Sequence, residues 1–478
     1  MTIQDTWSRL PIRSLARNAL LLVCGVLVGT LLLICSYALP TGPMREHILF
    51  EVDDICSSKE ALPGRANAGN DATDMQMLAI AASELPEGKG LIENVMMAPY
   101  LVPASPDVRM TQEAILRATV DPEAEGRFEI YPRYWHGYLA LLKPQLLVMD
   151  YYSILMLNGM ALLCLFTAFV VLLFRHDLGR FAPAFVLAFL LGSPVTVSLN
   201  MQYYSCAYIT LLALIAMLVL YKRLESMDKG LFGSMFLLIG MVTNYVDFLT
   251  YPIMTLGMPL ALLAVMQRGT NRSFGSYVAN ALWWLVGYGG MWAAKWGLSA
   301  LVLGPQTLQE VVNQLIVRSS SQAATGIGDI KAERVGSLSY YDALYGCWVR
   351  IIGAATLRVL IGSFALANAV YVVWAYKGGR MNKVPVGSVL ALVFAALLPF
   401  FWVFVLKNHT YMHSYFVYRI FLVTIAALGC IPPLLVKDKS IAVRAPAPVP
   451  QVTTHEVSER SERGAARDQA QAQAWSRE

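Results

Sequence analysis

Apolar residues lie along this chain in long runs that few polar positions interrupt. A helix needs about 20 mostly apolar residues to cross the hydrocarbon layer of a bilayer. About ten runs approach this length, and each predicts a membrane-spanning helix. They are Ala19–Leu39, Ile154–Phe174, Phe181–Val197, Ala207–Tyr221, Leu231–Tyr245, Pro252–Met266, Tyr277–Leu303, Ile351–Tyr376, Val386–Leu406 and Ile420–Val436. The pattern therefore predicts an all-α polytopic membrane protein.

The segments outside the runs suggest how the chain is organised. Residues 1–18 precede the first run, and the predicted transmembrane domain covers 19–436. Within it, segments 40–141 and 304–350 are much longer than the other connections, and the first has a mixed composition. Residues 440–478 are rich in Ala, Pro, Gln, Ser and mixed charge. That composition cannot bury a core, so we expect a disordered tail.

The basic residues favour one orientation. Arg9, Arg13 and Arg17 precede the first run, which is long for a signal peptide and lacks a clear cleavage site. An uncleaved anchor with its N-terminus inside places the short basic connections in the cytoplasm, as the positive-inside rule requires. These connections contain Arg175, Arg180, Lys222, Arg223, Lys229, Arg268, Arg272, Lys377, Arg380, Lys383, Lys437 and Lys439. We expect a bacterial inner-membrane protein with both termini cytoplasmic and the two long segments outside.

Composition excludes several classes of protein. Charged residues make up 14% of the 478 residues and hydrophobic residues 56%. In soluble domains roughly a quarter of the residues are charged, so a soluble enzyme fits this composition poorly. The net charge of +5 would suit nucleic acid, but the basic residues mark the cytoplasmic connections. We therefore expect a lipid bilayer as partner and no nucleic acid. Neither a nucleotide phosphate loop nor a zinc-ligand spacing occurs.

Cysteine usage leaves one question open. Cys56 and Cys347 fall in the two long outer segments, where a disulfide is chemically permitted. The sequence does not determine whether they pair.

An acidic motif follows the first run at Phe50–Asp54. Adjacent carboxylates repel each other, so one of them tends to have a raised pKa or to pair with a cation. Asp53 or Asp54 is a candidate general base for an acceptor hydroxyl just above the membrane. The alternative interpretation is a solvated acidic patch or a helix N-terminus.

A second candidate segment, Tyr131–Tyr138, closes the first long outer segment. An interfacial aromatic belt explains its rings, including Tyr131 and Trp135, but not Arg133 and His136. These two side chains have the chemistry to hold a phosphate or to stack on a sugar. Residues 139–152 after this segment predict a helix that lies along the interface rather than a span.

Two further candidates lie at outer helix ends. Asp247 is an acid at the end of a span. A carboxylate there costs free energy unless it is paired or hydrated, so Asp247 is a candidate functional residue. The segment 407–419 carries Lys407, His409, His413 and Arg419 where a lipid phosphate would lie. Smaller candidates are Tyr204, Lys295, Arg358 and an amphipathic helix over Leu308–Val317 that predicts a lid.

These segments resemble the GT-C class of polytopic glycosyltransferases, which use polyprenyl-phosphate-linked sugars. The likeness covers the plan of about residues 15–436 and the strings Y-P-R-Y-W-H-G-Y, D-F-L-T-Y-P and N-H-T-Y-M-H-S-Y-F-V-Y-R, which start at Tyr131, Asp247 and Asn408. The chain departs from better-known members in lacking a recognisable soluble outer domain at its C-terminal end.

The resemblance implies transfer of a sugar with inversion to an extracytoplasmic glycan, lipid or protein acceptor. Asp53 or Asp54 matches the position of the class's catalytic base. The donor phosphate would bind Arg133, His136, Lys407, His409, His413 and Arg419. The substrate would also contact Tyr131, Trp135, Tyr204 and Asp247. The sugar is left open between a pentose such as arabinose and a hexose, and a divalent metal is used by some members only.

The main alternative is a flippase or secondary transporter of lipid-linked or small polar substrates. Asp247, Lys295 and Arg358 would suit a transport path. Transporters usually contain paired repeats, and the two halves of this chain show no obvious similarity. An acyltransferase or phosphoethanolamine-type transferase ranks lower, because an intramembrane catalytic His and a metal-binding outer domain are both missing.

Overall fold

The structure of the protein is a computed structural model that describes residues 12–57, 71–104, 111–227, 230–270, 272–320, 322–325 and 333–437. Most of the predicted cytoplasmic segment 1–18 and the whole predicted tail 440–478 lie outside these residues. The described chain is predominantly helical, with two small two-stranded sheets.

Within the described residues, six helical segments are long and apolar enough to cross a membrane. They are Arg13–Tyr37, Tyr151–Arg175, Met201–Met227, Ala355–Lys377, Val386–Val405 and Ser414–Leu434. These segments contain α2 (Ile12–Tyr37), η2 (Met201–Tyr203), α8 (Tyr151–Arg175), α11 (Tyr204–Met227), α17 (Ala355–Lys377), α18 (Val386–Val405), α20 (Ser414–Val417), η3 (Tyr418–Phe421) and α21 (Leu422–Leu434). The protein is thus a helical multi-pass membrane protein.

The predicted count of ten spans is not confirmed. Three of the remaining runs form shorter apolar helices, Gly179–Leu191, Leu231–Val246 and Ile253–Met266. They correspond to η1 (Gly179–Phe181) with α9 (Ala182–Leu191), to α12 (Leu231–Val246) and to α13 (Ile253–Met266). Every residue of α13 up to Val265 is buried, so its apolar character reflects packing inside the bundle rather than contact with lipid. The fourth run forms α14 (Phe274–Leu303), which is 30 residues long but not among the six.

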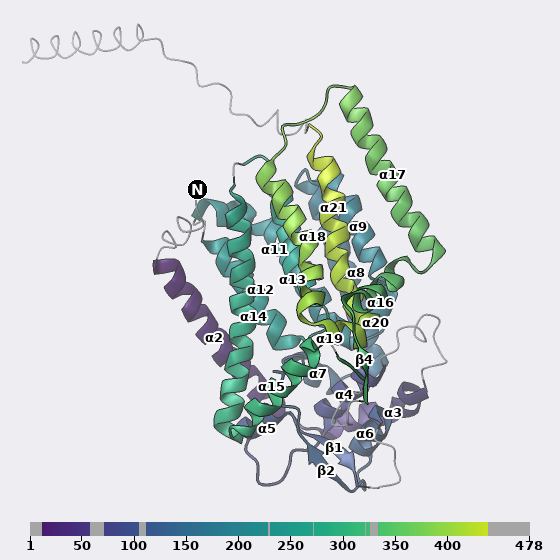
Figure 1. Ribbon diagram of the computed structural model, residues 1–478. Helices are drawn as coiled ribbons and strands as arrows, with labels where there is room; N and C mark the ends of the chain where they lie inside the picture. The colour runs from purple at the N-terminus through teal and green to yellow at the C-terminus, as the bar shows by residue number, and fades with distance from the viewer. Residues whose placement is uncertain are drawn as a thin grey trace, which may run out of the picture. The chain divides into compact units, whose positions relative to one another are not determined.

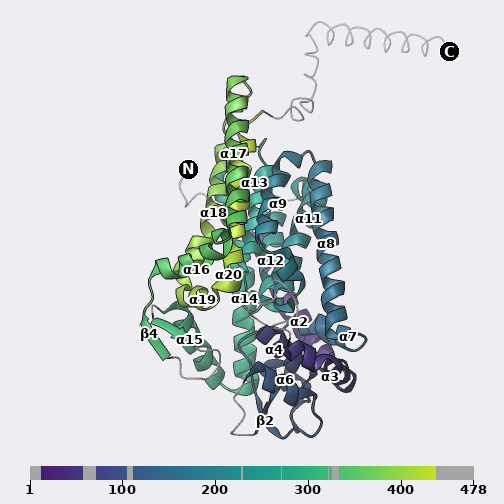
Figure 2. The same cartoon turned by 90° about the vertical axis from the view of Figure 1, so that its right-hand side faces the viewer.

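Helices α12 and α14 pack with their backbones in direct contact. A Cβ built on Gly240 would lie 2.1 Å from the carbonyl oxygen of Trp284, and one on Gly287 would lie 2.1 Å from that of Leu237. Two glycines therefore let the two backbones touch, which is how membrane helices gain dispersion contacts. Figures 1 and 2 show α8, α9, α11–α14, α18 and α21 running side by side, with α3, α4 and α6 gathered at one end, here called the loop end.

The first long segment folds into a layer at the loop end. It contains α3 (Gly42–Ser57), α4 (Asp71–Ala82), α5 (Leu91–Met97), β1 (Tyr100–Pro103), α6 (Gln112–Val120) and β2 (Gly126–Glu129). The two strands pair antiparallel, from Tyr100 opposite Glu129 to Pro103 opposite Gly126. The predicted interfacial segment contains α7 (Leu139–Leu146), and a turn at Asp150, whose side chain accepts from Ser153 N at 2.7 Å, starts α8.

Two buried lysines attach this layer to the bundle. Lys143 of α7 donates to the carbonyl of Ala81 at 2.7 Å, and Lys295 of α14 donates to the carbonyls of Val95 and Met96 at 3.1 and 3.0 Å. These carbonyls belong to the last turns of α4 and α5, where they have no partner within the helix. A cation at the negative end of a helix dipole is favourable, so both lysines stabilise the fold.

A buried carboxylate makes a further attachment. Asp74 of α4 accepts from the Tyr151 hydroxyl at 2.9 Å and from the amides of Met201 and Gln202 at 2.8 and 3.1 Å. Those amides open η2, the helical turn that leads into α11. A single acid therefore ties the layer to two membrane helices.

The second long segment contains α15 (Gln306–Ser319), β3 (Gln322–Thr325), β4 (Glu333–Ser337) and α16 (Tyr340–Ile352). The short helix α19 (Lys407–Met412) precedes α20 and packs against both α15 and α16. The predicted amphipathic helix Leu308–Val317 lies within α15. Helix α10 (Pro194–Ser198) is a single turn between α9 and η2.

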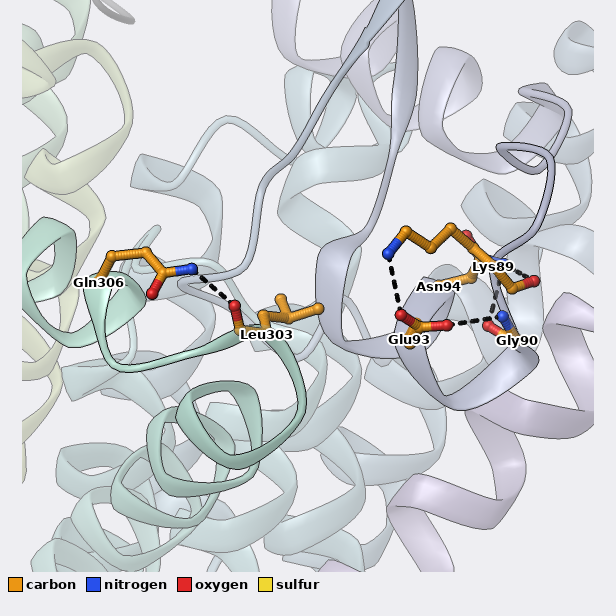
Figure 3. A network of polar contacts seen from close by, with 6 residues as sticks. All are labelled: Lys89, Gly90, Glu93, Asn94, Leu303 and Gln306. Carbon is orange, nitrogen blue, oxygen red and sulfur yellow. Dashed lines mark hydrogen bonds and ion pairs between the residues drawn. The ribbon is translucent and has the colours of Figure 1, made fainter.

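Figure 3 shows the junction of α14 and α15 near the start of α5. Gln306 donates to the Leu303 carbonyl at 2.7 Å, which closes the turn between the two helices. On the α5 side, Glu93 accepts from the Gly90 amide at 2.9 Å and pairs with Lys89 at 3.0 Å. The junction through which α15 is attached is therefore a defined turn beside a capped helix.

Cys56 and Cys347, the cysteines of the two long segments, are both buried free thiols. They lie on α3 and α16, and no disulfide links them.

The helix contact at Gly287 generates a stability prediction. Gly287→Ala places a methyl group on the Leu237 carbonyl, so α12 and α14 must separate and the protein should lose about 1–3 kcal/mol. Gly289→Ala is the matched control, since a Cβ there meets nothing within 4 Å. Thermal unfolding of the purified protein in detergent measures both. Equal midpoints for the two variants would contradict the contact.

Candidate functional site

The segment 131–138 forms a tight turn against the bundle. His136 has a left-handed backbone, φ 56°, which is unfavourable for a residue with a Cβ. Its Nε2 lies 2.9 Å from the carbonyl oxygen of Tyr131, and its Nδ1 lies 3.2 Å from the Tyr138 hydroxyl. The Gly137 amide donates to the Tyr245 carbonyl at 2.9 Å. These bonds hold the strained turn in place.

Three tryptophans fix the turn to α14. The indoles of Trp292 and Trp296 both donate to the carbonyl of Arg133 at 3.2 Å. The buried indole of Trp135 donates to the Met291 carbonyl at 2.8 Å. Since a buried indole N–H needs an acceptor, these contacts determine where the Arg133 backbone lies.

Arg133 lines a narrow cavity under α15, here called the arginine crevice. Its other lining residues are Tyr134, Trp292, Trp296, Val311, Gln314, Leu315 and Arg318. The guanidinium of Arg133 lies 4.6 Å from the centre of the Tyr131 ring and 3.6 Å from the Glu310 carboxylate of α15. Its Nε is buried and has no hydrogen-bond partner among the described residues. The free volume of the crevice is about 10 Å³, which is room for a single water molecule.

Arg318 is the second cation of the arginine crevice. It lies near the end of α15, with its guanidinium 5.9 Å from the centre of the Tyr134 ring. One of its nitrogens lies 2.9 Å from Nδ1 of His409 on α19. An arginine only donates, so Nδ1 of His409 accepts here and carries no proton.

His409 is therefore a neutral imidazole with its proton on Nε2. That nitrogen lies 2.9 Å from the carbonyl oxygen of Leu249, to which it donates. Burial and the neighbouring charge of Arg318 both hold the pKa of His409 well below its usual range. His409 links α15 to the turn after α12, and it supplies no positive charge to a phosphate.

Asp247 organises that turn. Its carboxylate accepts from the amides of Leu249 and Thr250, both at 2.9 Å, and from the Thr250 hydroxyl. Burial raises the pKa of Asp247 to about 6, although these hydrogen bonds act in the opposite direction. Leu249 has a left-handed backbone, φ 73°, and its carbonyl is the one that His409 holds. The position of His409 thus depends on Asp247.

The other predicted phosphate ligands have mainly structural contacts. Arg419 is buried among the rings of Tyr203, Tyr418 and Tyr251 and donates to the Gly192 carbonyl at 2.9 Å. His413 stacks on Phe416 with ring centres 5.0 Å apart, and burial lowers its pKa to about 3. Burial likewise lowers the pKa of His136 to about 3. These imidazoles are neutral, so the positive charge at the site comes from Arg133 and Arg318.

Four of the predicted residues lie elsewhere. Asp53 and Asp54 are exposed on α3, where Asp53 pairs with Arg117 at 2.7 Å. In both views α4 lies between α3 and α15 (Figures 1 and 2). Tyr204 donates to the carbonyl of Ser198 at 2.8 Å and stabilises the turn before α11. Lys407 is half-buried at the start of α19.

Some residues of the site were not predicted from the sequence. Arg318, Glu310, Trp292 and Trp296 join the arginine crevice from α14 and α15. The available signal was the amphipathic pattern of Leu308–Val317, which marks a covering helix but not its polar contacts. For metal binding, the described residues contain no group of three or more His, Cys, Asp or Glu side chains placed to hold an ion.

Comparison with known proteins identifies no relative of this chain. No family model, no curated protein and no solved structure matches it.

The buried imidazoles generate a pH prediction. The pKa of His413 is about 3 in the folded protein and about 6.5 when unfolded, so the unfolded chain binds the proton first. Stability should therefore fall as the pH drops below 6.5, by about 2 kcal/mol at pH 5 from this group. Asp247, with a raised pKa of about 6, acts in the opposite direction over this range.

His413→Phe keeps a ring on Phe416 and removes the titrating group. Its thermal midpoint should fall less between pH 7.5 and pH 5 than that of the unchanged protein. His176→Phe, at the partly exposed end of α8, is the control and should retain the full decrease. Parallel pH profiles for His413→Phe and the unchanged protein would refute a neutral His413.

Proposed function

We propose that the protein is a membrane glycosyltransferase that moves a sugar from a polyprenyl-phosphate donor to an extracytoplasmic glycan, lipid or protein acceptor. In this proposal it lies in the bacterial inner membrane with both termini in the cytoplasm, and the loop end faces outward. The proposal extends the GT-C resemblance of the sequence. The observation that carries it is the arginine crevice, in which two guanidinium groups lie among aromatic rings at the loop end of a membrane bundle.

The chemistry of the arginine crevice fits a sugar phosphate. A guanidinium matches the geometry of phosphate oxygens, and an aromatic face stacks on the apolar face of a sugar. Arg133 has a buried Nε that finds no partner among the described residues, so a hydrogen-bond donor of this lining residue is available to an acceptor. Trp292, Trp296 and Tyr134 supply the rings. Preorganised cations of this kind stabilise the charge that develops on a leaving phosphate.

The substrate requires α15 to move. The arginine crevice holds about one water molecule, and α15 supplies Val311, Gln314, Leu315 and Arg318 to its lining. The ion pair of Glu310 with Arg133 and the bond of Arg318 to His409 hold this helix closed. Gly304, with φ 102°, lies at the junction with α14 and provides the hinge. A phosphate that pairs with Arg133 would displace the Glu310 carboxylate from that guanidinium, which lets α15 move and makes this carboxylate available to accept a proton from the acceptor.

The reaction is a direct displacement at the anomeric carbon. The acceptor hydroxyl oxygen forms the new bond to this carbon and gives its proton to a carboxylate. The bond from the anomeric carbon to the phosphate oxygen breaks, and polyprenyl phosphate leaves with the electron pair. The product has the opposite anomeric configuration.

The base has two candidate positions. Asp53 and Asp54 match the expected position in the sequence, but Asp53 is engaged by Arg117 on an exposed helix face. Glu310 is the carboxylate next to the phosphate-binding guanidinium, and a general base must lie within hydrogen-bond reach of the proton it removes. We therefore assign the base role to Glu310 and keep Asp53 and Asp54 as the comparison.

The contacts of the charged residues favour the transferase over the flippase or transporter alternative. Lys295 and Arg419 donate to helix-end carbonyls, and Asp247 holds a turn. Arg358 donates to the carbonyls of Ile352 and Gly353, both at 2.9 Å. Charged groups that are engaged in this way stabilise the fold and do not mark a transport path.

Transfer from a radiolabelled polyprenyl-phosphate pentose or hexose in proteoliposomes tests the proposal. Arg133→Gln and Arg318→Gln should each lower the rate by about 100-fold or more, because each removes a donor to the leaving phosphate. Arg127→Gln is the matched control, since Arg127 pairs with Glu129 on the exposed surface of the same layer. It should retain full activity.

The same assay identifies the base. Glu310→Gln should abolish transfer, while Asp53→Asn and Asp54→Asn should retain it. Loss of activity in an aspartate variant alone would move the base to α3. Absence of transfer by the unchanged protein with every donor, or full activity of both arginine variants, would refute the proposed function.

A further inference from the structure

The protein has a second cavity, separate from the arginine crevice. Its volume is about 450 Å³, and it lies where α16 meets α17 and α20. The lining residues that matter here are Tyr345, Val349 and Arg350 of α16, Gly353 and Ala354 of the following turn, and Ser414 of α20. None of them belongs to the arginine crevice.

Helix α16 has one buried face and one exposed face. Ala343, Cys347 and Ile351 are fully buried and recur every fourth residue. Tyr341 and Tyr345 are 80% and 73% exposed, and Val349 follows at the same spacing. An exposed aromatic and apolar stripe on a helix that leads into a membrane span is typical of the bilayer interface.

The next helix gives the cavity access to lipid. Only 6% of the apolar window of α17 is buried, the smallest share among the six candidate spans of the described residues. Figure 1 shows α17 at one side of the bundle. The cavity lies at the start of this helix, so an occupant reaches it from the bilayer and its chains lie along an apolar surface.

Arg350 gives the cavity its charge. Its side chain is exposed, and it makes no hydrogen bond or ion pair with any described residue. Arg358, one turn into α17, bonds the carbonyls at the end of α16 and neutralises the negative end of that helix. The cavity therefore has a free cation, with the hydroxyl-bearing residues Tyr345 and Ser414 also in its lining.

We propose that this cavity binds the phosphate headgroup of an anionic bilayer phospholipid. The Arg350 guanidinium pairs with the phosphate, the hydroxyls of Tyr345 and Ser414 donate to its oxygens, and the acyl chains follow α17. Complementary charge and the lipid-facing surface of α17 favour this occupant over a soluble anion. The site is independent of the proposed sugar transfer and holds whether or not the arginine crevice is catalytic.

Native mass spectrometry of the full-length protein tests the site. The protein is exchanged in detergent into equal amounts of phosphatidylglycerol and phosphatidylcholine with identical acyl chains. The unchanged protein should retain phosphatidylglycerol about tenfold better, because the choline ammonium of phosphatidylcholine offsets the attraction between its phosphate and Arg350. Inorganic phosphate at millimolar concentration should not displace it.

Two variants test the charge and the free volume of the cavity separately. Arg350→Gln removes the cation, and Ala354→Phe places a ring in the cavity while keeping the cation; both should abolish the preference. Arg380→Gln is the matched control, because Arg380 lies over Trp374 near the other end of α17, at 4.2 Å from the ring centre. It should keep the preference. Thermal midpoints establish that each variant is folded.

Three results would overturn the proposal. They are an unchanged preference in folded Arg350→Gln and Ala354→Phe, equal retention of the two lipids by the unchanged protein, and displacement of the lipid by inorganic phosphate. None of these results bears on sugar transfer, so failure of this site and failure of the proposed function are distinguishable.

Discussion

Cations at helix C-termini are the interaction on which the rest of this structure depends. Lys143, Lys295 and Arg419 are buried, and each donates to carbonyls at the end of a helix that lies far away in the sequence. Arg180 does the same to the carbonyl of Val436, just past the end of α21. Inside a membrane protein these carbonyls have no water to bind, so the cation and the helix end satisfy each other.

This use of charge separates the cations that stabilise the fold from those that line the two proposed sites. All three fully buried Lys and Arg side chains of the described residues are engaged in this way, so cations in other surroundings are conspicuous. Within the part of the chain that the structure describes, Arg133 has a buried donor without a partner, Arg318 shares the arginine crevice with it, and Arg350 lines an open cavity. Arg133 lies in the first of the two long segments of the sequence, and Arg318 and Arg350 lie in the second.

The sequence predicted the helical membrane class because span length is set by the bilayer and is visible in composition. It did not distinguish buried helices from lipid-facing ones, since α13 inside the bundle is as apolar as a span. The site was predicted in part. Arg133 stood out as a charge in an aromatic string, whereas the partnership of Arg318 with His409 joins residues 91 positions apart and depends on tertiary packing. The charge state of a histidine could not be predicted from the sequence either, because it depends on how deeply the side chain is buried.

Thermal unfolding of Lys295→Met and Arg133→Met, measured side by side in one detergent, tests the central claim most directly. Both changes remove a mostly buried cation and keep a long apolar side chain. Loss of Lys295 leaves the Val95 and Met96 carbonyls without their donor, and the midpoint should fall by several degrees, about 2–4 °C for each kcal/mol lost. Arg133→Met should unfold within about 2 °C of the unchanged protein. Equal losses, or a larger loss for Arg133→Met, would contradict the division between structural and functional cations.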